Sequence, residues 1–94
     1  MINELGEIST SGGVLLKMWE VIVPSGSRPL VRHSHIRFEI TLITAGSGIY
    51  TVGDKKYTIK PYEIFVFASN EQHCVTEVGK DGLKMINLHF EPRY

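Results

Sequence analysis

The chain contains a single cysteine, Cys74, and no excess of charge of either sign. One cysteine excludes an internal disulfide framework and any zinc module built from several cysteines, and it is consistent with a cytoplasmic protein. Ten Lys and Arg residues balance ten Asp and Glu residues. Because a nucleic-acid-binding face needs a basic excess, we expect no nucleic-acid contact by this chain itself.

Long apolar runs are also absent from the sequence. No stretch approaches the roughly 20 apolar residues of a membrane-spanning helix, and residues 1–13 lack the basic start and apolar stretch of a signal peptide. We therefore expect no membrane contact. The 94 residues provide for one domain only. A domain this short has a thin core, so we expect it to gain stability from a partner or a bound ion.

Short apolar segments separated by Gly, Pro and Asp make up most of the chain. Polar residues 1–13 are expected to form an N-terminal arm, and residues 14–94 a single domain. The spacing predicts about eight short strands, which is typical of an all-β sandwich or barrel. Turns are expected at 45–48 and 80–82, and the wholly apolar strand 64–68 is expected to be covered on both faces. The predicted strands are 14–23, 30–33, 36–44, 49–52, 57–60, 64–68, 73–78 and 83–90.

The strand at 36–44 alternates apolar and polar side chains, so its two faces differ in character. Ile36, Phe38, Ile40 and Leu42 share the even-numbered face. In one arrangement the odd-numbered face lines the interior, and the apolar even-numbered face then needs cover from the arm, a strand or a second copy of the chain. In the other arrangement the odd-numbered face meets water and the even-numbered face forms the core.

Histidines provide the candidate chemistry on this strand. His33, His35 and Glu39 share the odd-numbered face, and a bend or twist of the strand would let them converge on one ion. Imidazole and carboxylate ligands suit Zn, Ni, Fe or Mn. The alternative is a metal-free polar pocket in which the histidines hydrogen-bond each other and Glu39, or bind an organic ligand directly.

Residues 26–46 resemble the first sequence motif of the cupin superfamily. The motif is a glycine, here Gly26, then His33 and His35 around one residue, Glu39, and Gly46 after six further residues. Gly26 lies one residue further from the first histidine than is usual in that family.

Residues 53–73 resemble the second cupin motif, with Gly53, Pro61 and His73 in the expected order. Two positions depart from it, because Glu63 replaces the usual glycine after the proline and Glu77 replaces a frequent asparagine. The resemblance to cupins implies a small double-stranded β-helix, or jelly-roll, barrel. It also implies one interior divalent-metal site, with four ligands: His33, His35, Glu39 and His73.

Residues 38–48 and 85–92 resemble the sensor domains of AraC-type transcriptional regulators. That resemblance implies a small-molecule effector, a homodimer, and DNA binding through a C-terminal helix-turn-helix domain that this chain does not contain. The chain would then be an excised sensor domain or a stand-alone relative. Polar side chains on neighbouring strands are the candidates for effector binding: Arg37, Tyr50, Asn87 and His89.

Three functions follow from these patterns. The first is small-molecule sensing and dimerisation within an AraC-type regulator. The second is a stand-alone metal-dependent cupin enzyme of the dioxygenase, isomerase or decarboxylase type, and the third is a dimerisation or storage module without chemistry. We expect a binding domain rather than an enzyme, because the sequence offers no base or nucleophile beyond the metal ligands. Cys74 is expected to be a small buried residue, since no second histidine is placed to activate it.

Overall fold

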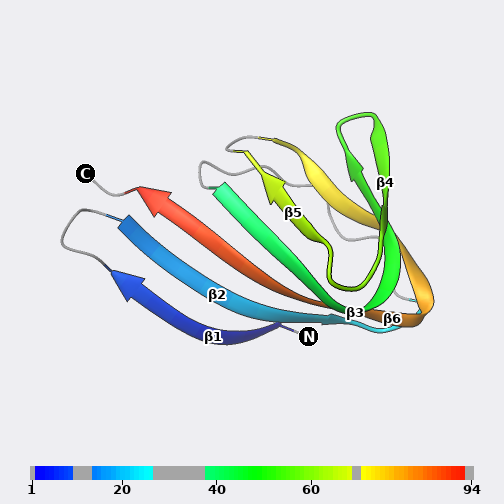
Figure 1. The fold of residues 1–94 in the computed structure, drawn as a ribbon, viewed down its shortest axis with the longest axis horizontal. Coiled ribbons are helices and arrows are strands. Elements are labelled where there is room, and N and C mark those ends of the chain that lie inside the picture. The colour runs from blue at the N-terminus through cyan, green and yellow to red at the C-terminus, as the bar shows by residue number, and fades with distance from the viewer. Residues whose placement is uncertain (1, 10–13, 27–37, 69–70, 93–94) are drawn as a thin grey trace.

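The computed structural model describes residues 2–9, 14–26, 38–68 and 71–92, and within these ranges the chain is all-β (Figure 1). Six antiparallel strands are present there: β1 (Ile2–Ser9), β2 (Val14–Val23), β3 (Phe38–Val52), β4 (Lys55–Ile59), β5 (Ile64–Phe67) and β6 (His73–Pro92). No helix among these residues is long and apolar enough to cross a membrane.

The sheet is built around two long strands, β3 and β6. They pair side by side from Phe38 opposite Phe90 to Val52 opposite His73. The strand order is β1-β2-β6-β3-β4, and β5 pairs with the first half of β3. One half of the sheet is therefore five strands wide, in the order β1, β2, β6, β3, β5, while β4 extends the other half (Figure 1).

The turns expected at 45–48 and 80–82 do not end strands, and that prediction is wrong. Both segments lie inside β3 and β6, whose pairing continues through register shifts between Ile43 and Ala45 and between Gly46 and Gly48. Gly46 and Gly82 have positive φ angles of 85° and 75°. Such residues form bulges that bend a strand without stopping its ladder, so two long bent strands replace four of the predicted short ones.

The structure shows which face of β3 is buried and which is exposed. Glu39, Thr41 and Ile43 are buried, whereas Phe38 is 48% and Leu42 36% exposed. The odd-numbered face of this half-strand therefore lines the interior, and the alternative in which the even-numbered face forms the core is wrong. The core combines inward side chains of β2 to β6: Val23, Ile43, Tyr50, Ile59, Phe67, Val75, Leu83 and Met85.

Two predicted segments behave differently from expectation. Residues 2–9, which the sequence places in an arm, form β1 and pair with β2; the domain boundary at residue 13 stays a prediction. Strand 64–68 is not covered on both faces, because Ile64 is 63% and Val66 64% exposed. Among the described strands, β5 lies at an edge of the sheet, and only its odd-numbered side chains turn toward the interior. Strand 30–33 and Ile36 lie outside the described residues.

Candidate functional site

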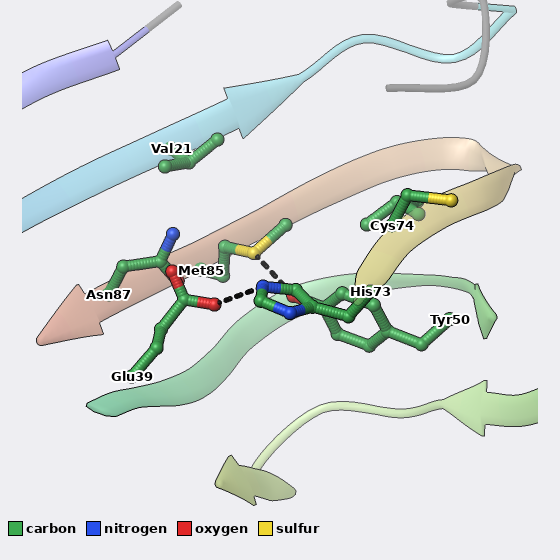
Figure 2. Close-up of a pocket in the computed structure, with 8 residues that line it drawn as sticks. Val21, Glu39, Tyr50, His73, Cys74, Met85 and Asn87 are labelled. Atoms are coloured by element: carbon green, nitrogen blue, oxygen red, sulfur yellow. Dashed lines mark hydrogen bonds and ion pairs between the residues drawn. The ribbon is translucent and has the colours of Figure 1, made fainter. Parts of the chain in front are cut away.

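A buried carboxylate, that of Glu39, is the centre of the candidate site. Glu39 lies near the start of β3, directly opposite His89 of β6. The bend of the long β3–β6 ladder also brings His73, from the other end of β6, over the same carboxylate (Figure 2). His73 Nε2 lies 2.7 Å from Glu39 Oε2, and His89 Nε2 lies 2.5 Å from Glu39 Oε1. The Glu39 and His73 side chains are only 5% and 2% exposed.

Neighbouring groups hold both imidazole rings in place. The His73 ring stacks on Phe67, with centroids 3.9 Å apart and planes 4° from parallel. Its Nδ1 lies 3.0 Å from the carbonyl oxygen of Glu71. The rings of His89 and Trp19 pack edge to face, with centroids 4.7 Å apart and planes inclined at 63°. Both ring nitrogens of His73 thus face oxygen acceptors, and an imidazole can donate to two acceptors at once only when both nitrogens carry protons.

This geometry sets the charge states of the cluster. Burial alone would raise the pKa of Glu39, but hydrogen bonds and charges from His73 and His89 outweigh burial and lower that pKa to about 2. Burial alone would lower the pKa of His73, but the bonds to Glu39 and to the Glu71 carbonyl raise it above its usual value. Burial, and then the charge of Glu39, raise the pKa of Tyr50, so its hydroxyl stays neutral.

Further polar side chains surround the cluster on the inner face. Thr41 Oγ1 donates to Asn87 Oδ1 at 2.8 Å, and the Tyr50 hydroxyl donates to Met85 Sδ at 3.3 Å. Asn87, Tyr50 and Met85 border a cavity of about 50 Å³, which is large enough for an ion with water or for a group of a few atoms, and far below the roughly 300–1,000 Å³ of a drug-sized pocket. Its described lining is Val21, Glu39, Tyr50, His73, Cys74, Val75, Met85 and Asn87 (Figure 2).

The residues singled out in the sequence fall into two groups. Five of them gather on the inner face: Glu39 and His73 from the predicted metal set, and Tyr50, Asn87 and His89 from the predicted ligand-binding set. The other three lie outside the described residues, so their roles stay predictions: His33, His35 and Arg37.

Two contributors to the site, and one contact of a third residue, were not predicted from the sequence. Thr41 and Met85 were not proposed, although Thr41 shares the inward parity of Glu39 and Met85 shares that of Asn87. That parity was the available signal. The expected contact of His89 with an effector stays a prediction, and the structure shows that His89 contacts Glu39 directly. Cys74 is buried and forms no disulfide, as expected.

The donor atoms of the cluster fit a divalent transition metal in type, because carboxylate oxygen and imidazole nitrogen are common ligands of such ions. Among the residues that the structure describes, no three His, Cys, Asp or Glu side chains are arranged as a metal site. Glu39 and His73 would have to exchange their mutual ion pair for bonds to the ion. A complete site would also need ligands from outside the described part of the chain.

Comparisons with known proteins agree with this architecture. An uncharacterized protein of Methanocaldococcus jannaschii is 27% identical over 92 residues, which span 98% of this chain and 74% of that protein. A predicted oxalate decarboxylase from Thermotoga maritima has a similar structure, with a TM-score of 0.70 and 22% identity over 94% of this chain and 91% of that one.

A cupin with a double-stranded β-helix fold, from Methanocaldococcus jannaschii, also has a TM-score of 0.70, at 15% identity over 99% of this chain and 80% of that one. At these identities the structural likenesses establish the fold, which is the cupin double-stranded β-helix. Residues 28–94 match the family model of the AraC-like ligand binding domain. This match covers most of the chain, and the protein therefore belongs to the AraC-like ligand-binding domain family.

Proposed function

We propose that this domain is the small-molecule-sensing and dimerisation domain of an AraC-type transcriptional regulator, and that its effector binds inside the barrel. The observation that carries the proposal is the cluster of Glu39, His73 and His89, buried on the inner face beside a cavity. Burying a charged cluster costs free energy that an apolar core would not, so its presence favours a functional role over a structural one.

The chemistry of the cavity favours an effector with groups that can both donate and accept hydrogen bonds. Glu39 is ionised and accepts. Asn87 uses its amide oxygen to accept from Thr41, which leaves its amide nitrogen to donate to a ligand. Because the cavity is small, we expect only the polar end of the effector, a hydroxyl or amino group, to reach the carboxylate.

Regulation of transcription would require DNA binding by a second domain. This chain has a formal net charge of zero, which suits an effector-binding domain and not a DNA-binding face. We place the DNA contact in a helix-turn-helix domain joined to this one, and the protein in the cytoplasm.

A second candidate function is a metal-dependent cupin enzyme, and the donor set of the cluster favours it. Glu39 and His73, together with His33 and His35, would hold a divalent transition metal. Such an ion would supply Lewis-acid chemistry to a bound substrate. The residues of this chain would orient the substrate, since the neutral Tyr50 hydroxyl and the Asn87 amide both border the cavity.

A thermal-shift screen with sugars, small organic acids and divalent metal salts tests the binding site. We expect one class of compound to raise the melting temperature of the wild type by on the order of 10 °C at about 100 times its Kd. Glu39→Gln should abolish that shift, because it removes the buried acceptor. Glu77→Gln is the matched control, since Glu77 is exposed on β6 outside the cavity, and it should keep the shift.

Two outcomes of this screen contradict the proposal: no compound shifts the wild type, or Glu39→Gln responds like Glu77→Gln. Elemental analysis of protein purified without a metal column separates the two candidate functions. Stoichiometric metal, with a shift produced by the metal salts alone, favours the enzyme. If the protein contains no metal and metal salts do not raise its melting temperature, the metal site is contradicted, and an organic effector remains the expected ligand.

A further inference from the structure

The five-stranded half of the sheet has a second face, and it is strongly apolar. We call the side chains pointing away from the barrel interior there the outer face. The strand registers align them in rows across the sheet, and one row runs Gly6, Met18, Leu88, Ile40, Val66 from β1 to β5. The neighbouring rows contribute further apolar side chains: Ile8, Leu16, Phe90, Phe38, Ile86, Leu42 and Ile64.

No described strand covers this outer face. The first half of β6 folds over the opposite face, as the contact between His73 and Glu39 shows. Val66 is 64%, Ile64 63% and Ile8 62% exposed. Such exposure of β-branched side chains on β1 and β5, at the two sides of one sheet, is unusual for a surface that meets only water.

The size of the outer face matches an interface. Five strands about 4.8 Å apart and three rows about 6.6 Å apart cover roughly 480 Å² of flat sheet per copy. A typical monomer's largest apolar patch is about 300–600 Å². Two such flat faces packed together bury roughly 1,000 Å², which reaches the lower bound for a specific interface. Side chains that project from the sheet add to this area.

The outer face is not flat, and its two edges have complementary shapes. Over β1 and β2 lies a groove of about 420 Å³, beside Gly6, where an added Cβ would meet no atom within 4 Å. At the other edge the side chains of Ile64 and Val66 form an exposed ridge on β5. Apolar residues dominate the lining of the groove: Leu5, Gly6, Glu7, Ile8, Leu16, Lys17, Met18 and Leu88.

We propose that a second copy of this chain packs on the outer face, with a two-fold axis running along β6. β6 is the middle strand of the five. Rotation about it turns one outer face onto the other and places the β5 ridge of each copy over the β1–β2 groove of its partner. Every contact then occurs twice, as in an isologous dimer.

Charge and polarity favour a second copy over a charged partner. The central row, from Gly6 to Val66, holds no polar side chain. The polar residues lie toward one end of the face, with Asn3 and Glu20 in the row of Ile86 and Lys84 beyond it. An apolar centre with a polar rim is the usual anatomy of an interface. A face without charge at its centre does not repel its own copy. The outer face is the surface that would serve the dimerisation proposed above, and this dimer does not depend on which effector binds.

Light scattering coupled to size-exclusion chromatography tests this dimer. The wild type should elute at about 21 kDa, twice the chain mass of 10.6 kDa. Val66→Glu should weaken the dimer roughly 100-fold or more, because it buries an unpaired carboxylate in both copies of the interface. Ile2→Glu is the matched control. Ile2 is 69% exposed, and its register opposite Val21 places it on the other face, so this variant should remain a dimer.

Gly6→Leu tests the contact between groove and ridge. The added side chain fills space that is open in one copy, so the fold should tolerate it. The β5 ridge of the partner can then no longer enter the groove, and dimer affinity should fall at least about 10-fold. A monomeric wild type, a dimeric Val66→Glu, or Gly6→Leu with unchanged affinity each overturns the proposed dimer. Effector binding is read separately by the thermal-shift screen, so failure of either proposal is distinguishable from failure of the other.

Discussion

Replacing Gly46 with alanine is expected to remove much of the protein's stability. Gly46 has a φ of 85°, and a Cβ there would lie 2.1 Å from the carbonyl oxygen of Gly82 and 2.9 Å from the Cα of Leu83. Both are backbone atoms of β6, so no side-chain rotation relieves the contact. The left-handed conformation costs about 1–3 kcal/mol and the crowding about 1–3 kcal/mol more, against a typical total of roughly 5–15 kcal/mol.

Urea denaturation followed by circular dichroism measures this loss. Gly53→Ala separates its two causes, because Gly53 also has a positive φ, 61°, while an added Cβ there meets nothing within 4 Å. We expect Gly53→Ala to lose only about 1 kcal/mol. Equal losses in the two variants would mean that β3 and β6 do not approach each other closely at Gly46. The bend that brings His73 over Glu39 would then be in doubt.

Stability of the metal-free protein should be greatest between about pH 4.5 and pH 6.5. The folded pKa of Glu39, about 2, lies below its ordinary value of 4.5, so its contribution is present above pH 4.5 and is lost as the pH falls toward 2. The folded pKa of His73 lies above its ordinary 6.5, so its contribution is present below pH 6.5 and is lost as the pH rises through the folded value.

Glu39→Gln isolates this contribution from that of the other titrating groups. The difference in free energy of unfolding between wild type and variant should be on the order of 3 kcal/mol near pH 5.5. It should shrink on both sides of that window. Chemical denaturation at several pH values, with a chelator present, gives the profile. A difference that does not change with pH would show that the buried carboxylate and imidazole do not interact as ions.

The sequence predicted the fold class well, and the extent of the strands less well. Alternating polarity at 36–44 and the cupin-like spacing of Glu39 and His73 are local signals, and an all-β barrel follows from them. The glycines near 46 and 82 were misread as turns because a positive φ is common to turns and bulges. Only the partner strand decides between them.

For the candidate site, the sequence predicted residues but not the contact between Glu39 and His89. Glu39 and His73 were found because a motif spacing carries them. The contact of His89 with Glu39 depends on the register of β3 against β6, which pairs residues 50 positions apart. No spacing within either strand encodes that register, so the sequence indicated only the face on which His89 lies.

The two ends of β6 meet on the Glu39 carboxylate inside the barrel. Nuclear magnetic resonance titration of the histidine ring nitrogens, in the wild type and in Glu39→Gln, tests this contact most directly. We predict that His73 titrates above pH 6.5 in the wild type and at a lower pH in the variant, because the carboxylate no longer stabilises its charged form. A His73 that titrates at or below pH 6.5 in the wild type, with no change in Glu39→Gln, would contradict a contact between His73 and the ionised Glu39.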